Sequence, residues 1–209
     1  MAAAPLTVNE DREFAVKFLA PAFMTFDLAM LMKTSHKSSE VQSIVDLNKE
    51  TNFTFGVVAG GSTEAFFQQS HYRLIRYKLQ TSASVEEGVR RVRESSDDHP
   101  YIFIGEQYTL EYHASRKPCG LVVVRGNETV KEGEYRLAVR KQLGSEMVAK
   151  LETSLSKLNQ TGRLDQLYTK WWIERSQCNG DASDTASSAF FTSTAAILVP
   201  LLLATLSRQ

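Results

Sequence analysis

The sequence has no excess charge of either sign and few of the residues that hold metal ions. Lys and Arg together number 24, as do Asp and Glu, and the 4 histidines and 2 cysteines lack the spacing of a zinc site. The basic cluster of Arg90, Arg91 and Arg93 is offset by glutamates beside it, which indicates a solvated helix face. We therefore expect no nucleic-acid surface, no bound metal and no other cofactor.

A catalytic pattern is missing as well. The serine, histidine and glutamate residues do not show the spacing of a nucleophile with its base, so we expect a binding protein rather than an enzyme. The 209 residues, 43% of them hydrophobic, are enough for one good-sized domain or two small lobes.

The most informative stretch that is present is a glycine turn at residues 60–63, Gly-Gly-Ser-Thr. It follows an apolar, strand-like run at 53–58 and opens a helix-like run that reaches about Leu79. Glycines permit a positive φ and close approach of a ligand, and Ser62 and Thr63 supply hydroxyls where the first helical N–H groups lack partners. Such a helix start favours a carboxylate or a phosphate, although an ordinary N-cap has the same sequence pattern.

Strand-like and helix-like segments alternate along the rest of the chain. A capping-box pattern at Ser84 starts one helix, and the apolar run at 28–32 is compatible with a strand or a helix. Further strands are expected at 101–104, 121–124 and 135–139, and further helices at 147–158 and 164–172, the last with Trp171 and Trp172 in the core. The alternation predicts an α/β fold.

Glu106 comes just after the strand expected at 101–104. Ligands of open α/β sheets collect at the carboxyl ends of the strands, so Glu106 and the helix start at Ser62 and Thr63 are expected to face one crevice. The alternative is a solvent-exposed charge at the start of the next helix.

The two cysteines, Cys119 and Cys178, form a reduced pair in a cytosolic protein or a disulfide in an extracellular one. Three asparagines in glycosylation sequons, Asn52, Asn127 and Asn159, favour the extracellular environment and the disulfide. If it forms, the disulfide is expected to stabilise the fold by roughly 4 kcal/mol through loop entropy.

The C-terminal part of the sequence is typical of a membrane-anchored protein. No charged residue lies between Asp184 and Arg208, and the largely apolar stretch at 189–206 is near the lower length limit of a membrane span. Arg208 would place the C-terminus in the cytoplasm. A glycolipid-anchor signal, with small residues at 179–183, is the alternative. Because the start of the chain does not have the pattern of a secretory signal peptide, we expect that a beginning is missing.

Several motifs together resemble the ligand-binding region of ionotropic glutamate receptors, closest to the non-NMDA type (kainate and AMPA). They are Ala-Pro-Leu-Thr at 4–7, Arg-Glu at 12–13, the glycine turn with Phe-Phe at 66–67, Glu-Glu-Gly-Val at 86–89, Phe-Ile-Gly-Glu at 103–106, Lys-Pro-Cys at 117–119 and Lys-Trp-Trp at 170–172. The resemblance covers residues 4–178. In that family two separate segments build an α/β, two-lobed clamshell similar to the periplasmic amino-acid-binding proteins.

The resemblance divides the chain into five parts. Residues 1–33 correspond to the end of the first ligand-binding segment (lobe 1, partial), and residues 41–178 to the second segment (lobe 2, nearly complete). Residues 34–40 form a linker in place of the family's pore region, 179–188 form a second linker, and 189–206 correspond to the family's last transmembrane helix.

The resemblance also implies roles for individual residues. Arg12 would hold the α-carboxylate of an amino acid through its guanidinium group. Thr7 would add a hydroxyl, and the backbone carbonyl of Pro5 would accept from the ligand's ammonium. Cys119 and Cys178 would form the disulfide of the second lobe.

Across the cleft, the backbone N–H groups and hydroxyls of Ser62 and Thr63 would hold the ligand's carboxylates, and Glu106 would pair with its ammonium. Tyr135 would lie near the ligand. Glycine-binding members of the family carry aspartate at the position of Glu106, so the resemblance favours L-glutamate as the ligand.

The chain departs from the family between Lys33 and Val41, where the family has its pore segments and this sequence has a short polar linker; the gate motif SYTANLAAFL is absent. We therefore expect the ligand-binding part of a glutamate-gated cation channel subunit, as a fragment, splice form or incomplete gene model unable to conduct alone. Its ligand-binding region would be extracellular at the plasma membrane, its C-terminus cytoplasmic, and its partners other subunits of a tetramer. The alternative is a membrane- or glycolipid-anchored amino-acid-binding protein without channel activity.

Overall fold

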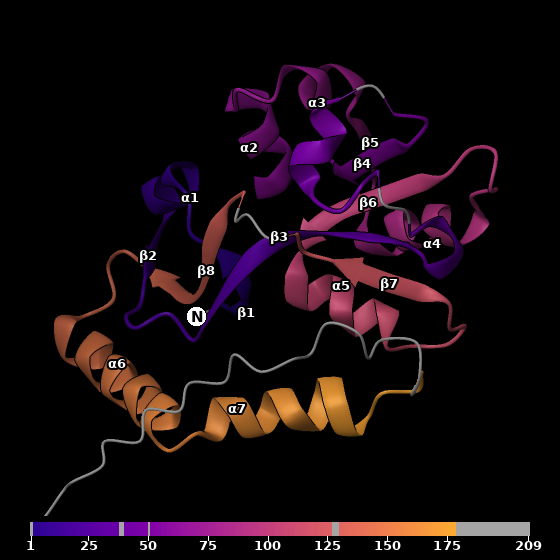
Figure 1. The fold of residues 1–209 in the computed structure, drawn as a ribbon. Coiled ribbons are helices and arrows are strands. Elements are labelled where there is room, and N and C mark those ends of the chain that lie inside the picture. The colour runs from indigo at the N-terminus through magenta and orange to yellow at the C-terminus, as the bar shows by residue number, and fades with distance from the viewer. Residues whose placement is uncertain (1, 38–39, 50, 127–129, 179–209) are drawn as a thin grey trace, which may run out of the picture.

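The computed structural model describes residues 2–37, 40–49, 51–126 and 130–178, which are organised around an eight-stranded sheet (Figure 1). The strands are β1 (Ala2–Thr7), β2 (Val16–Phe18), β3 (Met24–Lys33), β4 (Thr54–Val58), β5 (Gln80–Ser82), β6 (Tyr101–Glu106), β7 (Leu121–Val124) and β8 (Glu132–Arg140). Their order is β1-β8-β3-β6-β4-β5, with β2 also paired to β8 and β7 also paired to β3. The fold is mixed α/β, as the alternation of segments predicted.

Strand β3 is shared by the two parts of the sheet. Residues 24–27 pair with β8, whereas residues 28–33 pair with β6 and β7, all antiparallel. The apolar run that fits either a strand or a helix is therefore a strand, and it is buried on both faces. Ala29 and Leu31 belong to one hydrophobic core, and Met30 and Met32 to another, which explains why the run is continuously apolar rather than alternating.

The first part of the sheet consists of β1, β2 and β8 with the start of β3. The short helix α1 (Glu10–Ala15) connects β1 to β2, and both of these strands pair antiparallel with β8. Asn9 is the N-cap of α1, where its side-chain oxygen accepts the Arg12 N–H at 2.9 Å. This cap sets where the Arg12 side chain leaves the helix.

The second part contains β4, which lies parallel to both β5 and β6. Helices α4 (Val85–Glu94) and α5 (Gln107–Ala114) cover the core that contains Leu31 and Phe103. At Ser84 the predicted N-cap is confirmed, since its hydroxyl accepts the Glu87 N–H at 3.2 Å. A Cβ added to Gly88 would lie 2.3 Å from the Phe103 ring, so α4 packs directly on β6.

The single helix expected from the glycine turn to about Leu79 is two helices, α2 (Ser62–Gln69) and α3 (Arg73–Lys78). Ser70 takes an extended conformation between them, and its hydroxyl donates to the Phe67 carbonyl at 3.1 Å. A serine can end a helix in this way because its side chain competes with the next backbone N–H. The hydrophobic spacing continues across the break, so it did not reveal the break.

The C-terminal helices are α6 (Ser145–Gln160), α7 (Arg163–Tyr168) and the π-helix η3 (Thr169–Glu174). The expectation that both tryptophans lie in the core is wrong for Trp171, whose side chain is 39% exposed. Trp172 is half-buried and donates its indole N–H to the Tyr108 carbonyl at 2.7 Å. Cys119 and Cys178 form the expected disulfide, with their Cα atoms 5.5 Å apart.

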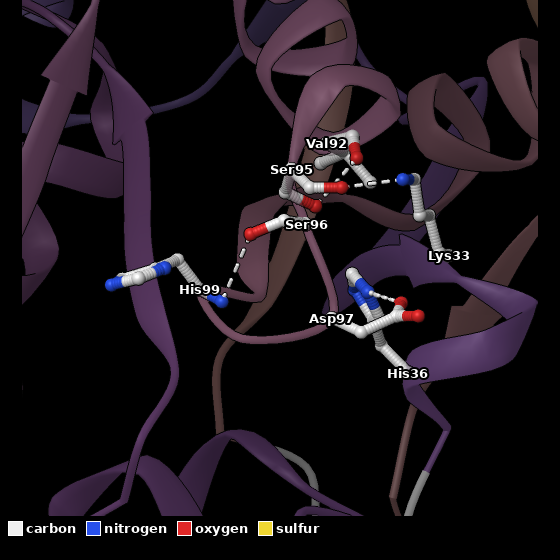
Figure 2. Close-up of polar contacts among 7 residues, drawn as sticks. All are labelled: Lys33, His36, Val92, Ser95, Ser96, Asp97 and His99. Carbon is white, nitrogen blue, oxygen red and sulfur yellow. Dashed lines mark hydrogen bonds and ion pairs between the residues drawn. The ribbon is translucent and has the colours of Figure 1, made fainter.

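The start of the predicted linker at 34–40 is anchored to the fold. Residues 34–36 form a 3-10 turn, η1 (Thr34–His36), and another, η2 (Ile44–Asn48), follows it. Figure 2 shows the contacts: the buried His36 places Nε2 2.9 Å from Asp97 Oδ1, and Lys33 donates to the Ser95 carbonyl. The chain that leaves β3 is thus attached to the loop after α4.

Two expectations fall on residues 179–209, outside the described part of the chain: the linker at 179–188 and the transmembrane helix at 189–206. Within the described residues, no helix is both long enough and apolar enough to cross a membrane. The division into lobes stays a prediction; β8, from the segment assigned to lobe 2, pairs with β1 and β2 from the segment assigned to lobe 1.

Candidate ligand-binding site

Three of the predicted site residues contact the carboxylate of a fourth, Glu106. Glu106 is the last residue of β6 and the N-cap of α5. Its Oε1 accepts from the Thr7 hydroxyl at 2.5 Å and from the Ser62 hydroxyl at 3.5 Å, and its Oε2 accepts from the Tyr135 hydroxyl at 2.5 Å. These side chains come from β1, α2, β6 and β8, and Glu106 and Ser62, which were expected to face one crevice, are in direct contact.

Arg12 lies beside this group through Thr7. Thr7 is the last residue of β1 and is 2% exposed, and its carbonyl accepts from Arg12 Nη1 at 2.7 Å. In the described part of the chain, no carboxylate lies within ion-pair distance of the Arg12 guanidinium. The geometry therefore leaves a partly buried cation close to the Glu106 carboxylate with donors available to a ligand.

The glycine turn has the open helix start that its sequence suggested. Gly60 has a positive φ of 69°, and Gly61 is the N-cap of α2, where no side chain caps the first N–H groups. The N-cap is thus Gly61, whereas the Ser62 hydroxyl points to Glu106 and the Glu64 carboxylate accepts the Gly60 N–H at 2.6 Å. Thr63 is buried beside Ser62, and its predicted contact with a ligand stays a prediction.

Tyr135 is held rigidly against the carboxylate. Its side chain is 2% exposed, and its ring stacks on Phe26 at 4.4 Å and on Phe23 at 6.1 Å between centroids. Burial, together with the negative charge of Glu106, raises the pKa of Tyr135, so its hydroxyl keeps its proton and remains a donor. In this structure Tyr135 orients Glu106.

Lys131 belongs to the same group but was not identified from the sequence. Its Nζ donates to the Ser62 carbonyl at 3.3 Å and lies 5.2 Å from the centre of the Phe66 ring. Burial lowers the pKa of Lys131, the nearby Glu106 charge opposes that shift, and the Arg12 charge adds to it. Lys131 lies in a charged stretch of the sequence that is typical of solvated surface, so no sequence pattern indicated a role for it.

The other predicted residues are placed as follows. Pro5 lies in β1, two residues before Thr7, and the role of its carbonyl stays a prediction. Of the asparagines in sequons, Asn52 and Asn159 are exposed, whereas Asn127 lies outside the described residues. Exposure is required for glycosylation but does not demonstrate it.

The site defines a class of protein: a mixed α/β ligand-binding domain in which a carboxylate and two cations converge. Among curated proteins, the chain is 31% identical over 185 residues to "Glutamate receptor 3" from Rattus norvegicus and to "Glutamate receptor 3" from Homo sapiens. In each case the match covers 83% of this chain and 20% of the relative, so the chain spans about a fifth of the length of these relatives. No family model matches the sequence.

Among solved structures, "Drosophila muscle GluRIIB complex with glutamate" has the same fold, with a TM-score of 0.69 and 27% sequence identity. The similarity covers 81% of this chain and 67% of that chain. In sequence and in fold, the chain matches the ligand-binding region of ionotropic glutamate receptors. This class agrees with the expectation of a binding protein rather than an enzyme.

Proposed function

We propose that the site binds L-glutamate or a closely related α-amino acid, with Glu106 as the partner of the ligand's ammonium. The observation that carries the proposal is a carboxylate held by three neutral hydroxyl donors, Thr7, Ser62 and Tyr135. Such donors orient the carboxylate without neutralising its charge. A ligand ammonium forms a charge-assisted hydrogen bond with this carboxylate, which none of the three hydroxyls provides.

Arg12 binds the α-carboxylate in this proposal. Its guanidinium presents several donors in a planar fork, whereas its hydrogen bond to the Thr7 carbonyl uses one of them. The Thr7 hydroxyl adds a further polar contact, and the Pro5 carbonyl accepts from the ligand's ammonium. On the opposite side, the backbone N–H groups of Ser62 and Thr63, at the start of α2, donate to a carboxylate of the ligand.

In the whole protein we assign this domain to a glutamate-gated cation channel subunit at the plasma membrane. The domain faces the extracellular side, residues 189–206 cross the membrane with the C-terminus in the cytoplasm, and other subunits complete a tetramer. The similarity to glutamate receptors supports this assignment. A second candidate is an anchored amino-acid-binding protein without channel activity, which is favoured by the attachment of residues 33–36 directly to the domain.

The test of the binding function is calorimetry on the full chain with the Glu106→Gln substitution. Glutamine keeps the shape of the side chain but removes its charge, so L-glutamate affinity is expected to fall by about tenfold or more. The affinity for glutarate, which has no ammonium, is expected to fall far less. The control is Glu146→Gln, at a position whose side chain is 84% exposed and far along the chain from the site.

Equal losses for L-glutamate and glutarate would contradict the assignment of Glu106 to the ammonium. An absence of L-glutamate binding by the unsubstituted chain would overturn the proposed function itself.

A further inference from the structure

The site contains a carboxylate and two cations. The Lys131 ammonium contacts the Ser62 carbonyl, and the Arg12 guanidinium contacts the Thr7 carbonyl, so two cations lie beside the residues that hold the Glu106 carboxylate. The Glu106 carboxylate accepts from the hydroxyls of Thr7, Ser62 and Tyr135, none of which carries charge. Among the described residues neither cation is in an ion pair, so each is available to a carboxylate of the ligand.

Lys131 is positioned to meet part of that ligand. Its Nζ contacts the carbonyl of Ser62, the first residue of α2, and lies over the Phe66 ring on the next turn. No carboxylate of the described residues lies within ion-pair distance of Nζ. An ammonium has three donors, and one carbonyl at 3.3 Å leaves the others for a ligand.

We propose that Lys131 is a specificity-determining residue, which favours amino acids with a second carboxylate over neutral amino acids. The inference rests on the proposed function. When the ligand's ammonium pairs with Glu106 and its α-carboxylate with Arg12, Lys131 is the cation that remains for the second carboxylate. A neutral amino acid leaves this half-buried ammonium without a counter-charge and still removes water from it, which is unfavourable.

A purely structural role predicts a different result. In that case Lys131 serves to join the chain before β8 to α2, through the Ser62 carbonyl and the Phe66 ring. Its substitution then weakens the binding of every amino acid to a similar extent, because the whole site is disturbed. The two roles are separated by comparing a charged ligand with a neutral ligand of the same shape.

The experiment measures L-glutamate binding to the full chain in detergent micelles by calorimetry, and L-glutamine binding by displacement of L-glutamate. Lys131→Met keeps an unbranched apolar stem and removes the charge. We expect L-glutamate affinity to fall by about tenfold or more, and L-glutamine affinity to change by less than about threefold. Lys131→Arg keeps the charge and should retain most of the preference for L-glutamate.

The control substitution is Lys17→Met, at an exposed position of β2. Thermal unfolding of each variant confirms that it is folded. Equal losses for the two ligands in Lys131→Met, no loss at all, or a Lys131→Arg variant as unselective as Lys131→Met would each overturn the role of Lys131. In all three results the unsubstituted chain still binds L-glutamate, so the proposed function stands. A chain that binds neither ligand overturns both.

Discussion

At the scale of the residue, the polar groups of the site are joined to one another by hydrogen bonds. Thr7 donates its hydroxyl to Glu106, and its carbonyl accepts from Arg12. An amino acid that enters the site therefore replaces hydrogen bonds that already exist. Its affinity depends on the difference between two sets of contacts, and charged groups that match the ligand in geometry as well as charge contribute most to that difference.

Arg12→Lys is expected to weaken L-glutamate binding by about tenfold or more, because a compact ammonium does not reproduce the two-point contact of a guanidinium with a carboxylate. Calorimetry on the full chain measures the change. Arg90→Lys is the matched control, since Arg90 is 58% exposed on α4 and pairs with Glu94. An unchanged affinity would refute the role of Arg12.

At the scale of the element, several contacts tie the C-terminal helices to the sheet. Glu111 of α5 pairs with Arg125 at 2.9 Å, and Tyr168 of α7 donates to the other Glu111 oxygen at 3.4 Å. The Tyr168 ring also stacks on Trp172 at 5.5 Å. The disulfide between Cys119, just before β7, and Cys178, after η3, closes this arrangement.

Replacement of both Cys119 and Cys178 by Ser is expected to lower the free energy of unfolding by about 2–4 kcal/mol, because the bond closes a loop of 59 positions and restricts the unfolded chain. Denaturant unfolding of the full chain, with and without the double substitution, measures the difference. A free energy of unfolding that does not change would show that residues 119–178 are already restricted in the unfolded state.

At the scale of the whole molecule, β3 makes the two parts of the sheet continuous. The site lies where these parts meet, since Thr7 comes from one part and Glu106 from the other. After β3, Lys33 contacts Ser95 and His36 contacts Asp97. The family has its pore segments at this point of the sequence.

For this reason the chain expressed alone in oocytes is expected to give no L-glutamate-dependent current. A fusion that inserts the pore segments of a conducting relative between Lys33 and Val41 provides the comparison. Two-electrode recording distinguishes the outcomes, and a current from the unmodified chain would contradict the expectation.

Much of the fold was predictable because its signals are local. The strand at 54–58, the positive φ of Gly60 and the cap at Ser84 follow from residue types and their spacing. The break at Ser70 was not predicted, since serine is tolerated inside helices and only the tertiary structure shows which conformation it takes. The exposure of Trp171 depends in the same way on how η3 packs.

The sequence by itself determined the chemical types at the site: a carboxylate at Glu106, a guanidinium at Arg12 and an open helix start at Ser62. Local motifs carry that information for Glu106 and Ser62, because the strand end and the turn each form within a few residues, whereas the resemblance indicated Arg12. Only the tertiary structure decided that Thr7 and Tyr135 both bind Glu106 and that Lys131 joins them. These contacts depend on β8 pairing with both β1 and β3, and such long-range strand pairing is set by the packing of the whole core rather than by any one segment.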